Sequence, residues 1–165
     1  MSDYFKEILN HSKKASSAMS KLSAEDRSRI LMNISGFLLS KKDGILEANR
    51  IDIDRAKSNN ISAPMINRLV LTSEKIDQLS RDVEKIAQME DPLNQTLENW
   101  TNPSNGLQFT KVSVAIGVIG IIYESRPNVT IDAACLCLRS GNVSILRGGS
   151  ECIETNKKLY ECIQD

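Results

Sequence analysis

The chain has 165 residues, which is long enough for one ordinary domain with a core of its own. Its 21 basic and 21 acidic side chains balance, so no charge excess indicates a nucleic acid partner. The first residues (MSDYFKEILNHSKK) mix charged and apolar groups and do not predict a signal peptide. The longest apolar run, near residues 114–123, falls well short of the roughly 20 residues that a membrane-spanning helix needs. We therefore expect a cytoplasmic protein that binds neither nucleic acid nor membrane.

Residues 1–92 are expected to form a helical segment. Apolar side chains recur roughly along one helical face of residues 4–22. Ser23, with Asp26 three positions later, resembles a capping box in which aspartate replaces the usual glutamate, and it predicts the start of a second helix. We expect Gly44 to interrupt or end that helix, with only a short helical turn after it.

The rest of this helical segment carries loop and cap signals. Residues 58–60 (SNN) predict a loop, and Pro64 suits the first turn of a short helix, where its missing N–H costs nothing. Thr72 can cap a further helix, which Asp91-Pro92 ends and which has an apolar stripe spaced 3-4-3. The stripe consists of Ile76, Leu79, Val83 and Ile86. It covers too few heptads for a coiled coil, so we expect this helix to pack on the rest of the chain.

Residues 93–112 are polar and rich in turn formers. Asn105-Gly106 is a common pair in two-residue hairpin turns, and it lies between short β-prone pieces at residues 100–101 and 107–112. The sequence therefore predicts a β-hairpin or linker between the helical segment and the remainder of the chain.

Residues 113–165 are predicted to form a partial parallel α/β unit. The Val- and Ile-rich run at residues 114–122 is typical of a strand buried on both faces. Pro127 disfavours helix at the residue before it, so the chain should leave this strand in a bend. Asn128 is a good N-cap for the helix that follows, and Gly141 suits its C-terminal end.

A second short strand at residues 143–146 completes a strand–helix–strand unit, which specifies parallel pairing. Such sheets bind ligands at the carboxyl ends of their strands, where this chain has two loops, at residues 124–128 and 147–151. The second loop (RGGSE) opens a helix and presents successive backbone N–H groups, which favours anions. The alternative interpretation is a tight glycine turn beside a solvated arginine.

The four cysteines do not predict a metal site. Cys135 and Cys137 are two apart on a predicted helix and point to nearly opposite sides, so they cannot easily share a metal. The chain has no C-x-x-C pair, and His11 lies far from Cys152 and Cys162 in the sequence. We expect all four thiols to be reduced and structural.

The motifs GVIGIIYESRPNVT and SGNVSILRGGSE, with the upstream segment LTSEKIDQLSRDVEKIAQMEDPLNQ, resemble the gamma-glutamyl phosphate reductases of the aldehyde dehydrogenase superfamily. The similarity covers the whole chain but only the N-terminal portion of these longer enzymes. The resemblance implies part of the aldehyde dehydrogenase fold, with the hairpin as a projecting oligomerisation element. It also implies NADPH-dependent reduction of L-glutamyl 5-phosphate to glutamate 5-semialdehyde, a step of proline biosynthesis.

The resemblance also assigns roles at the two loops. It implies that Asn128 donates its side-chain amide to a developing oxyanion, whereas the residues alone favour helix capping. It implies that Arg147 favours the 2′-phosphate of NADPH. Arg126 could bind the substrate's carboxylate or phosphate, or it could pair internally with Glu124 or Asp132. The expected cofactor-binding residues are Ser125, Arg126, Pro127, Asn128, Arg147, Gly148, Gly149, Ser150 and Glu151.

In the family, the nucleophilic thiol belongs to a catalytic domain beyond the portion that this chain resembles, so the resemblance implies a truncated protein without turnover of its own. The alternative is a non-catalytic nucleotide-binding or interaction module that pairs with a separately encoded C-terminal half. A third hypothesis is a complete small enzyme that uses Cys135 or Cys152. Two parallel strands also leave unpaired sheet edges, so we expect marginal stability, aggregation or self-association through them.

Overall fold

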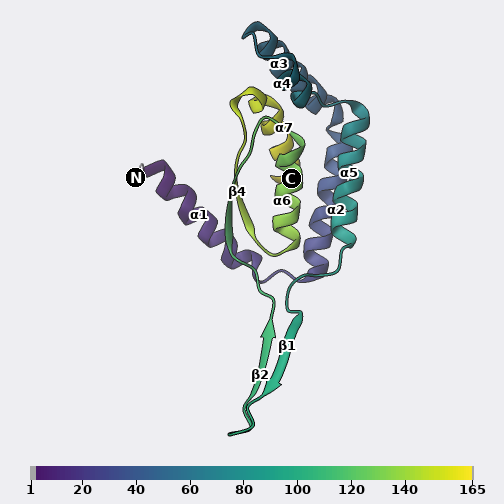
Figure 1. Cartoon of the computed structure of the whole chain (residues 1–165). Helices are drawn as coiled ribbons and strands as arrows, with labels where there is room; N and C mark the ends of the chain where they lie inside the picture. Colours follow the sequence, from purple (N-terminus) through teal and green to yellow (C-terminus); the bar gives the residue numbers. More distant parts are fainter. Residues whose placement is uncertain (1–2, 165) are drawn as a thin grey trace.

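The computed structural model describes residues 3–164, which form a helical and α/β body with a projecting hairpin (Figure 1). The order of elements along the chain is α1 (Asp3–Met19), α2 (Ala24–Ser40), α3 (Lys42–Ser58), α4 (Ala63–Leu69), α5 (Ser73–Gln88), β1 (Thr96–Thr101), β2 (Gln108–Val112), β3 (Val118–Ile122), α6 (Asn128–Arg139), β4 (Val143–Arg147), the short 3-10 helix η1 (Ser150–Cys152) and α7 (Ile153–Gln164). No helix within residues 3–164 is both long and apolar enough to cross a bilayer.

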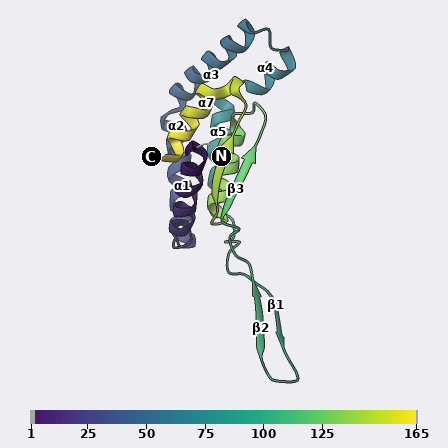
Figure 2. The ribbon, with the colours of Figure 1, turned by 90° about the vertical axis from the view of Figure 1, so that its left-hand side faces the viewer.

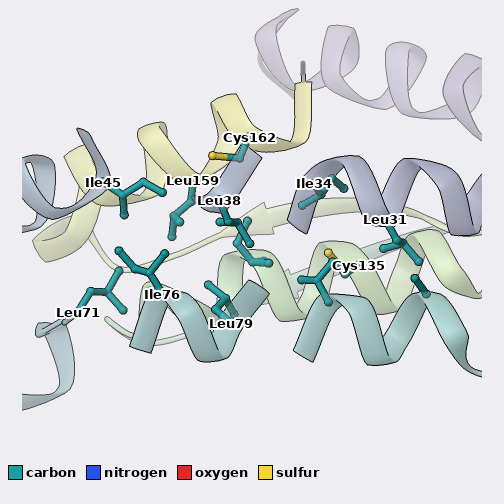
Figure 3. Close-up of a cluster of buried hydrophobic side chains, with 13 residues drawn as sticks. Leu31, Ile34, Leu38, Ile45, Leu71, Ile76, Leu79, Cys135, Leu159 and Cys162 are labelled. Carbon is teal, nitrogen blue, oxygen red and sulfur yellow. The ribbon is translucent and has the colours of Figure 1, made fainter. Parts of the chain in front are cut away.

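The main core lies where α2, α5, α6 and α7 pack together (Figure 3). Three residues of the predicted apolar stripe of α5 are buried there and the fourth, Ile86, packs against them partly buried, which confirms that this helix packs on the rest of the chain. The core's fully or almost fully buried members include Leu31, Ile34, Leu38, Ile76, Val83, Ile131, Cys135, Leu159 and Cys162. In contrast, α1 extends away from the body toward its N-terminal end, and Tyr4 and Leu9 on it are exposed (Figure 1).

Local capping signals are confirmed, but the prediction at Gly44 is wrong. The Asp26 backbone N–H donates to Ser23 Oγ at 3.0 Å, and the Ser23 N–H donates back to the Asp26 carboxylate at 3.2 Å. Thr72 likewise accepts a hydrogen bond from the backbone of Lys75. Gly44 lies in the first turn of α3, which continues unbroken to residue 58. α2 ends at Ser40, so the break between the two helices precedes Gly44. Burial of the apolar residues that follow Gly44 extends α3 well beyond the expected short turn.

Buried polar side chains of α3 hold the start of α7. The Asp52 carboxylate is fully buried, and its Oδ2 accepts hydrogen bonds from the Thr155 backbone N–H and from Thr155 Oγ1, both at 2.7 Å. The Asn49 side chain donates to Thr155 Oγ1 and to the Leu69 carbonyl, and it accepts from the Leu71 N–H. The loop before α7 is therefore positioned by residues about a hundred positions earlier in the chain.

The predicted hairpin is confirmed. β1 and β2 pair antiparallel and project away from the body, as Figure 2 shows. Gly106 at their turn has φ +72°, a conformation that favours glycine. Trp100 and Phe109 are cross-strand partners whose rings stack with centroids 5.2 Å apart, and both side chains are exposed. The hairpin thus carries an aromatic pair that the body does not cover.

The predicted parallel unit is confirmed, but its first strand is shorter and far more exposed than expected. β3 pairs with β4 from Val118↔Val143 to Ile122↔Arg147, and α6 forms the crossover. β3 begins at Val118 rather than near residue 114. Val114, Ile116 and Ile122 are 71%, 82% and 84% exposed. Within the described residues this sheet has only two strands, so nothing covers these side chains.

Candidate functional site

Two of the predicted cofactor residues meet at the carboxyl ends of β3 and β4. Ser125, buried in the loop between β3 and α6, donates its hydroxyl at 2.5 Å to Glu151 Oε2 in η1, the short helix that follows the second loop. This hydrogen bond is the largest cause that holds the pKa of the Glu151 carboxyl below its ordinary value. The backbone supports the same junction, because the Tyr123 N–H donates to the Arg147 carbonyl at 3.0 Å. The two loops therefore form one structural unit with an ionised carboxylate at its centre.

At positions 148 and 149 the neighbouring atoms leave no room for a side chain. A Cβ atom at residue 149 would overlap Ser125 Oγ, and one at residue 148 would lie 2.5 Å from Asn156 Nδ2 and 3.0 Å from the Tyr123 ring. The φ of Gly149 is −62°, which any residue can adopt. The glycines thus allow the second loop to approach the first.

Sequence reasoning missed the polar network behind this loop. The Tyr123 hydroxyl and Thr130 Oγ1 lie 2.7 Å apart, and Thr130 Oγ1 donates to Asn156 Oδ1 at 2.9 Å. Asn156 Nδ2 in turn donates to Cys152 Sγ at 3.3 Å. Burial raises the pKa of the Tyr123 phenol, so it remains a neutral hydrogen-bonding group. These residues come from the loop after β3 and from α6, η1 and α7, and no short motif could have linked them.

A cleft of about 220 Å³ opens beside the Ser125–Glu151 bond. Met65, Arg68, Glu124 and Gly149 complete its lining. Arg68 pairs with Glu124 at 3.1 Å. No ion pair of Arg126 with Glu124 or Asp132 occurs among the described residues, so the internal pairing that was one alternative for Arg126 is not found. Carboxylate and hydroxyl groups at this cleft can accept and donate hydrogen bonds to a polar ligand such as a sugar diol.

The other members of the predicted cofactor set lie around this cleft without lining it. Arg126, Arg147 and Ser150 are exposed, and Pro127 is fully buried. Neither Arg126 nor Arg147 forms an ion pair with any residue in the 3–164 range. Both guanidinium groups thus remain available to an anion from outside the chain.

Asn128 does not cap α6, so that prediction is wrong. The preceding Pro127 has φ −56° and ψ −36°, which is already helical, and the helix therefore begins before the Asn128 side chain could cap it. Asn128 Nδ2 instead donates to Asp132 Oδ2, one turn later, at 3.0 Å. Burial is the main cause that raises the pKa of the Asp132 carboxyl. The amide keeps a second N–H that this bond does not use.

Asn128 and Asp132 line a groove of about 280 Å³ between α5 and α6. Arg68, Lys75 and Asp82 add charged groups of both signs to it. Arg68 lines the cleft beside Ser125 as well, so the cleft and the groove adjoin at this residue. The structure therefore places the predicted oxyanion donor in a polar groove next to the predicted nucleotide loops.

The thiols do not reach either cavity. All four cysteines are buried and outside any disulfide, and none lines the cleft or the groove. Burial raises the pKa of Cys135 to about 12 and that of Cys152 to about 11, and it also raises that of Cys137. These thiols are therefore protonated at neutral pH and are poor nucleophiles. Residues 3–164 contain no group of three His, Cys, Asp or Glu side chains able to hold a metal ion.

Comparisons with known proteins give the fold and the relatives of the chain. No protein-family model matches it. A gamma-glutamyl phosphate reductase of Thermodesulfovibrio yellowstonii is 38% identical over 161 residues, which cover 96% of this chain and 38% of that protein. The crystal structure of a gamma-glutamyl phosphate reductase from Thermotoga maritima matches with a TM-score of 0.93 at 33% identity, covering 98% of this chain and 39% of the other.

A more distant structure identifies the broader fold. An NAD-dependent benzaldehyde dehydrogenase from Corynebacterium glutamicum matches with a TM-score of 0.71 at 18% identity, covering 93% of this chain and 30% of that one. The chain thus has part of the aldehyde dehydrogenase fold, as expected from its motifs. It spans about two fifths of the length of the reductases that it matches.

Proposed function

We propose that this chain, which matches the N-terminal portion of gamma-glutamyl phosphate reductases, supplies the NADPH-binding loops and an amide donor for the reduction of L-glutamyl 5-phosphate to glutamate 5-semialdehyde. The reaction belongs to proline biosynthesis in the cytoplasm. The single observation that carries the proposal is the Ser125–Glu151 bond, which joins the two loops at the carboxyl ends of parallel strands. Ligands of open α/β sheets bind at such ends.

The residues at this junction fit a phosphorylated nucleotide. The glycines leave no side chain between the loops, the Glu151 carboxylate can accept hydrogen bonds from ribose hydroxyls, and Arg147 offers an unpaired guanidinium for a phosphate. Bound NADPH would supply the hydride. We assign Arg147 to the 2′-phosphate because its planar fork of donors suits phosphate oxygens.

Asn128 is assigned to the acyl group of the substrate. Its bond to Asp132 fixes the side-chain amide and leaves one N–H for the oxygen that becomes negative during the reaction. A preorganised donor of this kind stabilises a transition state by about 3–4 kcal/mol. Asn128 is half-buried in the groove, so its side chain can act in this way without changing position.

We further propose that the chain has no turnover by itself. Reduction of an acyl phosphate through a thioacyl enzyme needs a thiolate at the reacting carbon. The four thiols are buried, and three of them have raised pKa values. The nucleophile is therefore assigned to the portion of the reductases that lies outside the match.

Titration of the chain with NADPH, followed by cofactor fluorescence, tests the nucleotide proposal. We expect binding, and we expect Arg147→Glu to weaken NADPH more than NADH, because only NADPH carries the 2′-phosphate. Arg29→Glu on α2 is the matched control, since Arg29 is exposed and lines neither the cleft nor the groove. Equal losses for the two cofactors would remove the 2′-phosphate assignment, and a chain that binds neither would refute the proposal.

An assay with gamma-glutamyl phosphate and NADPH tests the proposed inactivity. We expect no NADPH oxidation above the background. Turnover that Cys135→Ala or Cys152→Ala abolishes would show that the chain is a complete small enzyme.

The exposed sheet favours a second candidate function, that of an interaction module. Val114, Ile116 and Ile122 are apolar and largely exposed beside a sheet of two strands. We propose that these side chains are covered by further strands, either from a separately encoded C-terminal half or from a second copy of the chain. Self-association of the chain is the simplest measurable consequence of this exposed surface.

A further inference from the structure

The hydrogen bonds behind the second loop run in a single direction. A threonine hydroxyl has one proton, and Thr130 Oγ1 donates it to Asn156 Oδ1 at 2.9 Å. The Tyr123 hydroxyl, 2.7 Å from Thr130 Oγ1, is therefore the donor in the bond between them. Asn156 Nδ2 donates to Cys152 Sγ at 3.3 Å, and Cys152 Sγ donates to the Gly149 carbonyl at 3.4 Å. This chain of hydrogen bonds thus begins just after β3 and ends on the backbone of the second loop.

The donors of the chain keep their protons at neutral pH. Burial is the main cause that raises the pKa of the Tyr123 phenol, and it raises the pKa of the Cys152 thiol to about 11. Thr130 is buried, so water does not compete for its hydroxyl. Removal of one buried member leaves its neighbours without a partner, which makes the chain sensitive to the loss of any single group.

The chain meets the backbone of the second loop at two points. The Gly149 carbonyl accepts the thiol proton, and because the peptide group is planar and trans, the Ser150 N–H points to the opposite side. A Cβ atom at Gly148 would lie 2.5 Å from Asn156 Nδ2 and 3.0 Å from the Tyr123 ring, so both side chains lie directly against the loop. The chain therefore determines the direction of one peptide group of the loop and the distance of the loop from α7.

We propose that Thr130 and Asn156 are positioning residues that hold the second loop in its nucleotide-binding conformation before the nucleotide binds. Neither residue lines the cleft beside Ser125, so both act through the loop rather than by contact with a ligand. The proposal rests on the proposed function, because it takes the second loop as part of the nucleotide site. Apparent affinity falls with the fraction of molecules in the competent conformation, so a loop that opens more often binds NADPH more weakly.

Maleimide labelling of Cys152, measured by peptide mass spectrometry, reports how often the loop opens in the absence of nucleotide. Cys152 is fully buried, so the reagent reaches it only after its surroundings open. Thr130→Val replaces the hydroxyl with a methyl group and interrupts the chain. We expect about fivefold faster labelling of Cys152, the effect of one lost buried hydrogen bond. Thr130→Ser keeps the hydroxyl and should label at nearly the parent rate.

Two cysteines of the main core and a distant variant show whether the opening is local. Cys135 and Cys162 are fully buried in that core, so their labelling reports opening of the whole body. Ser80→Ala is the matched control, because it removes a buried hydroxyl that lies 2.7 Å from Ser35 Oγ between α2 and α5. Thr130→Val should accelerate labelling of Cys152 alone, whereas Ser80→Ala should leave its rate relative to the core cysteines unchanged. Equal acceleration of all three thiols by Thr130→Val, or none, would overturn the proposal.

NADPH titration of the same chains separates this proposal from the proposed function. We expect Thr130→Val to weaken NADPH about fivefold, Thr130→Ser to bind it like the parent, and Ser80→Ala to change nothing. If the parent and Thr130→Val chains bind NADPH equally well, the positioning proposal alone is refuted. If Cys152 labelling depends on the Thr130 hydroxyl but the parent binds no NADPH, the nucleotide proposal is refuted and Thr130 retains its role in holding the loop.

Discussion

Gly149 lies directly against Ser125: a Cβ atom at residue 149 would overlap Ser125 Oγ and would lie 2.6 Å from Glu151 Oε2. The hydrogen bond between Ser125 and Glu151 therefore depends on the absence of a side chain at this position. The backbone of Gly149 is ordinary, so the requirement is one of space.

Gly149→Ala should break the junction between the two loops. Ser125 or Glu151 must move to admit the methyl group, and such overpacking costs about 1–3 kcal/mol. Urea unfolding measures the loss, and the NADPH titration should show weaker binding. Gly36→Ala is the matched control, because Gly36 is exposed in α2 with no atom within 4 Å of its added Cβ. That change should stabilise the chain by about 0.5–1 kcal/mol. A Gly149→Ala chain as stable as the Gly36→Ala chain would contradict the steric argument.

The Ser125–Glu151 bond should also make stability depend on pH. The folded pKa of Glu151 lies below its ordinary value of 4.5, so this group contributes stability above pH 4.5. That contribution is lost as the pH falls through the lowered folded pKa. Urea midpoints between neutral and acidic pH should thus fall more steeply for the parent chain than for Ser125→Ala. Parallel curves would show that the bond contributes nothing to the titration of Glu151.

Asp52→Ala should loosen α7 from α3. The change removes the buried acceptor of both Thr155 bonds, and a lost hydrogen bond to a buried charged group costs about 2–3 kcal/mol. Urea unfolding should report this loss, and hydrogen exchange at the Thr155 amide should accelerate. Asp54→Ala, two residues away and exposed, is the control and should change stability by about 0.5 kcal/mol or less. Equal effects of the two changes would refute the role of Asp52.

Features determined by a few neighbouring residues could be predicted from the sequence. Ser23 and Asp26 form their cap from side chains three residues apart, and a hairpin forms where Asn105-Gly106 predicts one. Its loop spans residues 102–107, however, and only Gly106 of this pair has a positive φ, so the turn is not the two-residue type. Gly44 shows the limit of such signals, since its local cost is small beside the burial of Ile45 in the core. The same limit applies to the first strand, because burial of an apolar run depends on distant segments that lie against it.

The candidate site likewise combines features that the sequence predicts with features that depend on distant segments. Parallel pairing was enough to place the loops of Ser125 and Glu151 at one edge of the sheet, although their hydrogen bond depends on space around Gly149. The Asn128 prediction failed because capping requires a non-helical residue at that position, and Pro127 had already begun the helix. The groove beside it is formed by α5 and α6 together, and no spacing within either helix indicates it.

Ile116→Lys should reduce association of the chain. Ile116 is 82% exposed in the extended segment before β3, and burial of such apolar side chains against a second copy is favourable by about 25 cal/mol per Å². A lysine here keeps the surface hydrated and opposes edge pairing. Sedimentation velocity over a concentration series should show association of the parent chain and less of it for Ile116→Lys. Leu107→Lys distinguishes the sheet surface from the hairpin surface. Leu107 is 56% exposed at the end of the hairpin, so this change should weaken only association through the hairpin. A parent chain that stays monomeric and melts sharply at all concentrations would contradict association through the sheet.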